Sequence, residues 1–255
     1  MKKISQSGEL QSLAAERVWR EFEKGLSERS PQSFVHILYQ CDALTVFLPE
    51  LDQRFHHHDN LLGASAKIGD RTLAALHYAA GQQMPTPTRW AITLHAVSPD
   101  QQPKNILAKG LTTTQHTSPG ADAVNTIGER LRAPNDYTEL ASLSANYLAV
   151  AISAMAAKPD LIVDLLDACD VWRRPERFEQ FLLSCEAIIA SQSNKASAPN
   201  AIPFLRSAAD RCSKVSAKAY VEQGISGPAV GESMRNERKI LVAQLKKQFE
   251  DIDNA

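Results

Sequence analysis

Apolar residues recur at helical spacing through most of the chain. After Pro159 they stand at positions i, i+1, i+4, i+5 and i+8, namely Leu161, Ile162, Leu165, Leu166 and Cys169, which places one apolar stripe on one helix face. A second helix is predicted from Pro175, because a proline in the first turn costs no hydrogen bond and Glu176 favours the positive end of the helix dipole. Ser30 and Pro31 open another helix in the same way, with Ser30 as its N-cap.

Similar patterns predict helices over six further ranges: 9–29, 67–84, 121–132, 134–157, 200–223 and 228–250. One stretch is ambiguous, because Trp90, Ile92, Leu94 and Ala96 alternate as they would in a strand. We assign it to a buried helix because its surroundings are helical. Residues 98–120 and 190–203 are rich in polar residues and proline and indicate loops or linkers. The sequence therefore predicts an all-α protein.

Composition narrows the class of protein. The 255 residues include 28 Lys and Arg against 29 Asp and Glu, so the net charge is −1 and any nucleic acid must bind to a local basic patch. Hydrophobic residues at 44% and charged residues at 22% exclude disorder and collagen-like structure. The longest nearly apolar run, Tyr147 to Ala157, is far short of the ~20 residues that cross a bilayer.

The N-terminus also lacks a signal peptide's apolar block. We therefore expect a cytoplasmic protein with no membrane partner. Its four cysteines are widely separated and include no C-x-x-C pair, so we expect them to be reduced and mostly buried.

Candidate chemistry in the residues themselves is sparse. His56, His57, His58 and Asp59 are adjacent, but adjacent side chains diverge whereas a metal needs converging ligands, so we interpret them as a surface loop and predict no metal site. Three basic groups lie beside expected helix ends or exposed helix faces, where they either hold phosphates or form ion pairs on solvated faces: Arg130 and Arg132; Arg173, Arg174 and Arg177; and Arg235, Arg238 and Lys239.

Three runs together resemble one family of proteins. They are GELQSLAAERVWRE at Gly8–Glu21, WRRPERFEQF at Trp172–Phe181 and GPAVGE at Gly227–Glu232. Cys41–Asp52 and Arg130–Asn135 fit the same order. The ordered set resembles the neck, body and tail of the bacterial CCA-adding tRNA nucleotidyltransferases, and the resemblance covers nearly the whole chain.

The resemblance implies a neck-like helical segment at residues 1–55, a helical body at 56–197 and a helical tail at 198–255. Glu16 and Arg17 match the E-R pair of the neck motif that supports the family's nucleotide pocket, although the preceding Thr-Pro of the family is Ala14-Ala15 here. Losing a capping hydroxyl typically weakens a helix start by about 1 kcal/mol.

In this family, catalysis belongs to an N-terminal head that uses Mg, ATP and CTP. The head carries a Gly-Gly turn, a D-x-D carboxylate pair and an E-D-x-x-R motif, and none of these appears before Gly8. Asp251 and Asp253 have the D-x-D spacing, but we interpret them as part of a frayed acidic tail. We therefore expect no catalytic residue and no cofactor in this chain.

Many relatives also carry an HD phosphohydrolase centre in the body, where histidines and an aspartate bind a metal that activates water. Here the H-D pair reads His95-Ala96, the upstream histidine position is Arg71, and the histidine-rich loop reads Thr-Thr-Gln-His at residues 113–116. Isolated imidazoles cannot replace the original shell, because the missing carboxylate supplied both a ligand and charge balance. The resemblance thus implies a degenerate HD region without phosphohydrolase activity.

In the family, the body and tail hold the acceptor–TΨC arm of tRNA while the head works on the 3′ end. A-form RNA is recognised largely through its shape and phosphates, so scattered arginines on a curved surface suit this task. We expect tRNA binding for CCA addition, with the head missing or on a separate polypeptide. The expected phosphate contacts are Arg130, Arg132, Arg173, Arg174, Arg177, Arg235 and Arg238.

Two alternatives from other classes stay open. One is a head-less relative whose helical surface serves protein interaction or homo-oligomerisation. The other is a residual metal-dependent phosphohydrolase.

Overall fold

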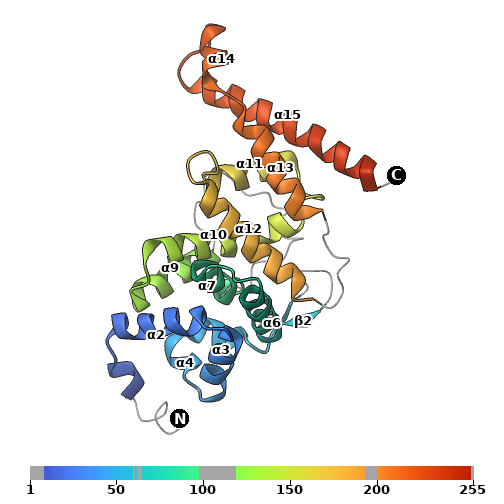
Figure 1. Ribbon diagram of the computed structural model, residues 1–255. Helices are drawn as coiled ribbons and strands as arrows, with labels where there is room; N and C mark the ends of the chain where they lie inside the picture. Colours follow the sequence, from blue (N-terminus) through green and yellow to red (C-terminus); the bar gives the residue numbers. More distant parts are fainter. Residues whose placement is uncertain (1–8, 60, 62–64, 98–118, 193–199, 254–255) are drawn as a thin grey trace.

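The computed structural model describes residues 9–59, 61, 65–97, 119–192 and 200–253. Nearly all of its regular structure is helical, which confirms the all-α prediction. The helices form an elongated stack, with the N-terminal helices at one end, the body in the middle and the tail helices at the other end (Figure 1). Across these ranges, none of the helices combines the length and hydrophobicity that a membrane crossing requires.

Aromatic rings attach the N-terminal helices to the body. A 3-10 turn, η1 (Glu9–Ser12), precedes α2 (Ala15–Ser27), so the helix expected over 9–29 is interrupted before Ala15. Trp19 of α2 packs edge to face against Trp90, with ring centroids 5.1 Å apart, and against Tyr137 at 5.0 Å. Such pairs add to the burial of the rings themselves, and they fix α2 on the body.

Three short helices follow: α3 (Pro31–Gln40), α4 (Leu44–Phe47) and α5 (Pro49–Arg54). Ser30 and Pro31 occupy the expected positions at the start of α3, but the Ser30 hydroxyl makes no capping hydrogen bond. The start of α3 therefore depends on the fixed backbone of Pro31.

The middle of the chain is built around a buried helix. This part contains α6 (Ile68–Gly81), α7 (Thr86–Leu94), α9 (Pro119–Leu131) and α10 (Asn135–Ile152). Every residue of α7 from Thr88 to Leu94 is buried, polar and apolar alike, and the structure confirms the helical assignment. Within α7, Arg89 donates hydrogen bonds to the carbonyl groups of Leu26 at 2.8 Å and Glu28 at 2.9 Å. This arginine thus satisfies carbonyls at the C-terminal end of α2 that lack helical partners.

A short two-stranded sheet replaces part of the loop expected around the histidines. β1 (His58–Asp59) pairs with β2 (Ala66–Lys67) in antiparallel orientation, with His58 opposite Lys67. The surface-loop interpretation is therefore wrong for His58 and Asp59, because the chain turns back toward α6 and the two backbones form a ladder. Strands of two residues are too short for a hydrophobic period to reveal them.

The second half of the chain begins its helices at prolines. α11 (Pro159–Ala168) and α12 (Pro175–Ala190) start where the sequence predicts. The helix expected over 200–223 is broken into α13 (Ala201–Ser213) and α14 (Ala217–Glu222), because the Ser216 hydroxyl accepts the Lys218 N–H and starts a new helix. The last helix, α15 (Pro228–Asp253), includes Asp251 and Asp253, so the prediction of a frayed acidic end is wrong.

One hydrophobic core connects the ranges assigned to neck, body and tail. It includes Phe22 from the first range, Leu148 from the second and Phe204 from the third. All four cysteines are buried free thiols, as expected. Burial raises the pKa of the Cys169 thiol, so this group stays protonated and unreactive near neutral pH.

Candidate nucleic-acid interface

Arg130, a predicted phosphate contact, is bound by the protein itself. Its guanidinium donates hydrogen bonds to the two Glu50 carboxylate oxygens at 2.8 and 2.7 Å and to the Phe47 carbonyl at 3.2 Å. Bidentate pairs of this kind combine strength with fixed geometry. Arg130 therefore joins α9 to α4 and α5, and most of its donor capacity is used there.

Arg177 satisfies the C-terminal end of α11. Its Nη2 donates to the Cys169 carbonyl at 2.9 Å, and its Nη1 donates to the Glu139 carboxylate at 2.8 Å. Because the last carbonyls of a helix lack intrahelical partners, a basic side chain here has a structural role. Only 19% of this side chain is exposed.

Arg235 and Arg238 attach the tail to the body. Asp160, Asp164 and Asp167 lie about one turn apart on α11 and meet a basic stripe on α15. The contacts are Arg235–Asp164 at 2.6 Å, Lys239–Asp160 at 2.5 Å and Arg238–Asp167 at 3.3 Å. The Arg238 guanidinium also lies 3.9 Å from the centroid of the Trp172 ring, a cation–π arrangement. These side chains form an interface within the chain.

The other three predicted arginines keep donors at the surface. Arg173 is 83% exposed, and among the described residues its partner is Asp170, which accepts from Nε at 3.0 Å. Arg174 donates to Glu139 at 2.7 Å but remains 55% exposed. Arg132 follows α9 with a φ of 55°, and its exposed side chain has no hydrogen-bond or ion-pair partner in the described part of the chain.

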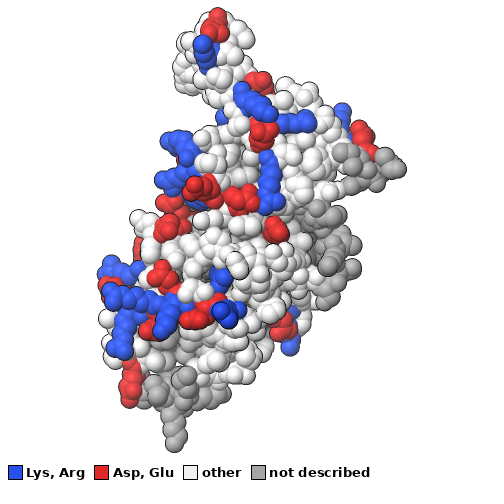
Figure 2. Space-filling view, viewed as in Figure 1, with Lys and Arg blue, Asp and Glu red and all other residues white. Residues whose placement is uncertain are grey.

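Glu139 lies beside two of these arginines, Arg174 and Arg132. It accepts from Arg174 and lines, together with Arg132, an open pocket of about 530 Å³ between α9 and α10. We call Arg132, Arg173 and Arg174 the basic edge. Lys and Arg side chains gather along this side of the molecule, beside α2 and α9 and again beside the loop between α11 and α12, with acidic side chains among them (Figure 2).

The neck motif lies on the outer face of α2. Glu16 and Arg17 stand in its first turn, and both side chains are exposed. Tyr137 donates to Glu23 at 2.8 Å, which places α2 against the start of α10. Arg20 and Lys24 extend the exposed face of α2. Sequence reasoning missed these two cations, because charges at this spacing are typical of any solvated helix face.

The residues at two expected HD positions meet an aspartate in the interior. Arg71 and His95 are 2% and 0% exposed, and Arg71 Nη1 lies 2.5 Å from Asp59 Oδ1. His95 Nδ1 donates to the Ile92 carbonyl at 2.8 Å, and the buried Nε2 has no hydrogen-bond partner among the described residues. Burial, and next the charge of Arg71, lowers the pKa of His95 to about 4. The imidazole is therefore neutral at pH 7.

This cluster disfavours the binding of a metal cation, because the Arg71 guanidinium already supplies the positive charge beside Asp59. Over the described residues, no group of three or more His, Cys, Asp or Glu side chains is placed to hold a metal ion. The expectation for residues 113–116 lies outside the described residues.

Comparisons with known proteins show what this chain is similar to. A family model described as "Probable RNA and SrmB- binding site of polymerase A" matches residues 1–55. The chain is 36% identical, over 97% of its length, to a multifunctional CCA protein of Pseudomonas fluorescens strain Pf-5. It is 33% identical, over 98% of its length, to that of Thioalkalivibrio sulfidiphilus. It covers 60% and 61% of these two relatives. The chain is thus similar over nearly its whole length to multifunctional CCA proteins, and it spans about three fifths of the length of these two relatives.

Proposed function

We propose that this chain is the tRNA-binding part of a CCA-adding enzyme, and that it serves the maturation of tRNA 3′ ends without transferring nucleotides itself. The observation that carries the proposal is the basic edge, whose three arginines keep exposed donors while Arg130, Arg177, Arg235 and Arg238 are held by the protein. The match of the first 55 residues to an RNA-binding family model supports the same partner.

Duplex RNA is recognised mainly through its shape and backbone. The deep major groove of A-form RNA hides base edges, so proteins contact its phosphates and 2′-hydroxyls by shape. The exposed arginines of the basic edge can supply such phosphate contacts locally, even though the net charge of the chain is −1. The packing of α9, α10 and α12 fixes the positions from which these arginines project.

In this proposal, a head outside this sequence carries the nucleotidyltransferase activity and uses Mg, ATP and CTP. The maturation of tRNA takes place in the cytoplasm. The body is proposed to be a degenerate HD region. In support, Arg71 is buried against Asp59, and His95 is neutral with its Nε2 enclosed. A residual phosphohydrolase is disfavoured because a metal would have to displace this guanidinium.

The test is direct binding of the full chain to a tRNA transcript, measured by filter binding at increasing salt. We expect an affinity that falls steeply between about 50 and 200 mM salt, as counterions released from phosphates predict. Absence of binding in dilute buffer would refute the proposal. Salt-insensitive association with another protein would favour the interaction-module alternative.

A further inference from the structure

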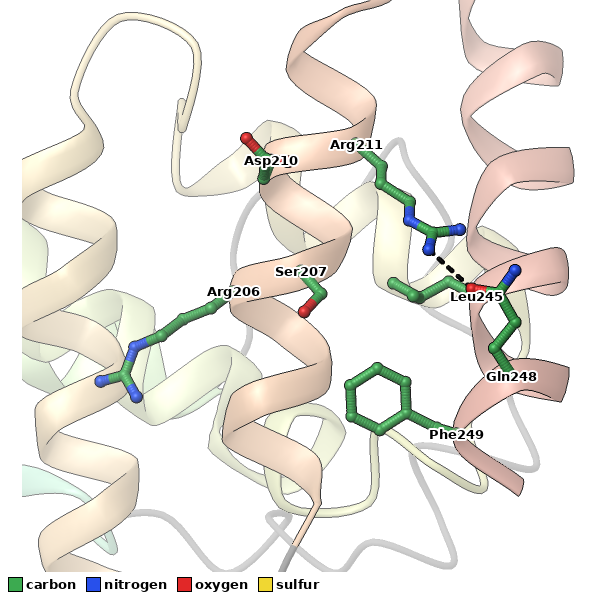
Figure 3. Close-up of a pocket in the computed structure, with 7 residues that line it drawn as sticks. All are labelled: Arg206, Ser207, Asp210, Arg211, Leu245, Gln248 and Phe249. Carbon is green, nitrogen blue, oxygen red and sulfur yellow. Dashed lines mark hydrogen bonds between the residues drawn. The ribbon is translucent and has the colours of Figure 1, made fainter. Parts of the chain in front are cut away.

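The groove between α13 and α15 is lined by side chains that the proposed function does not use. Its volume is about 490 Å³, within the roughly 300–1,000 Å³ of small-molecule sites. Figure 3 shows side chains from both helices converging on this space, and they are Ser207, Arg211, Leu245, Gln248 and Phe249. The two other lining residues, Arg206 and Asp210, point toward the opposite side of α13 (Figure 3).

An anchored aromatic ring forms one wall. Phe249 packs edge to face on Phe204, with centroids 5.6 Å apart and planes at 84°. Phe204 is fully buried, whereas Phe249 is only partly buried, so the core holds a ring whose surface is open to the groove. Leu245, 2% exposed, adds apolar surface beside it. Unstacked RNA bases bind by stacking on aromatic rings that are presented in this way.

Polar groups converge opposite the ring. Arg211 Nη2 donates to Gln248 Oε1 at 2.6 Å, a bond between the two helices that directs the guanidinium across the groove (Figure 3). The acceptor of this bond is an uncharged amide. In the described ranges, no carboxylate is paired with the charge of Arg211. The Gln248 amide N–H groups and the Ser207 hydroxyl supply further hydrogen-bonding capacity.

The outward-pointing residues carry compensated charges. Arg206 is paired with Glu179 at 2.5 Å, and Asp210 is paired with Lys214 at 2.8 Å. The charge that faces the groove is therefore that of Arg211. A ligand that suits this site has a flat apolar face, hydrogen-bonding edges and a negative group at one side, as a nucleotide unit has.

We propose that this groove receives one unpaired nucleotide of an RNA, with the base on Phe249, the base edge toward Gln248 and Ser207, and a phosphate at Arg211. The inference rests on the proposed function and deepens it. The basic edge holds duplex phosphates by charge, whereas the groove distinguishes RNAs that present an unstacked base. Binding then depends on an unpaired loop or bulge as well as on a stem.

The experiment compares two labelled RNAs by fluorescence anisotropy with the full chain in dilute salt. One is a hairpin with an unpaired loop, and the other is a blunt duplex with the same stem. Phe249→Leu keeps an apolar side chain but removes the ring, Phe249→Tyr keeps the ring, and Lys218→Ala is a control at an exposed cation of α14. Circular dichroism melting shows whether each variant folds.

We expect Phe249→Leu to weaken hairpin binding at least about fivefold, from the loss of one stacked base, and to leave duplex binding unchanged. Phe249→Tyr and Lys218→Ala keep the wild-type affinity for the hairpin. Unchanged hairpin binding by Phe249→Leu, or an equal loss for both RNAs, overturns the groove proposal alone. If the wild-type chain binds neither RNA, the proposed function fails and the groove proposal fails with it.

Discussion

The buried pair between Arg71 and Asp59 gives a sharp prediction about stability. The side chains of these residues are 1% and 16% exposed, and the contact between them is 2.5 Å. Within the described ranges, Nε, Nη1 and Nη2 of Arg71 have no acceptor that meets hydrogen-bond geometry, and the neutral His95 beside them supplies no negative charge. Asp59→Asn changes almost no volume, so its effect isolates the loss of the carboxylate charge.

Breaking a buried ion pair from one side typically costs about 3–5 kcal/mol, because the remaining charge stays buried without compensation. We expect Asp59→Asn to lower the free energy of unfolding by that amount, and we expect Arg71→Met to cost less, because Asp59 still accepts the Leu61 N–H at 3.1 Å. The double variant Asp59→Asn/Arg71→Met should recover most of the unfolding free energy that Asp59→Asn loses. Equilibrium urea denaturation at pH 7, followed by circular dichroism, measures all three.

The reasoning is refuted if Asp59→Asn costs less than about 1 kcal/mol, the size of an exposed pair. It is equally refuted if the double variant is less stable than Asp59→Asn alone, since removing the orphaned guanidinium must then be harmful.

Three further predictions concern His95, Arg177 and the tail. His95 is protonated near pH 6.5 in the unfolded chain and near pH 4 in the folded chain. The free energy of unfolding should therefore fall by up to about 3 kcal/mol as the pH drops from 6.5 to 4. A free energy of unfolding from urea denaturation that does not change over this pH range would contradict this. Arg177→Ala should destabilise the protein by about 1–3 kcal/mol in calorimetry, whereas Arg173→Ala, the matched exposed control, should not, and equal effects would argue against capping. Arg235→Ala should speed hydrogen exchange in α15 more than in α10, and unchanged exchange would mean that the ion pairs do not hold the tail.

The helix starts could be predicted because they depend on local chemistry. Pro31, Pro159, Pro175 and Pro228 each open a helix where expected, since a proline at the first turn needs no tertiary partner. The buried helix α7 was harder to predict from its own residues, because a helix surrounded on all sides loses its amphipathic period. Its neighbours decided the assignment.

The roles of individual arginines could not be predicted, because they depend on partners far away in the sequence. Arg130 is bound by Glu50, 80 positions earlier, and Arg235 is bound by Asp164, 71 positions earlier. Nothing local separates these side chains from Arg132 or Arg173, which remain exposed. Likewise, the Ser216 cap that divides the expected tail helix is a single hydroxyl within an otherwise helical pattern.

The most direct test of RNA binding through the basic edge is the salt dependence of tRNA affinity for the double variant Arg132→Ala/Arg173→Ala. Both side chains are exposed, so the fold should be unaffected, and Lys218→Ala, 82% exposed on α14, is the matched control. We predict weaker binding, and a log–log salt slope that is shallower by about 0.7–0.9 for each phosphate that the variant no longer neutralises. A double variant with the affinity and slope of the wild type, or a control that matches the double variant, would contradict the account.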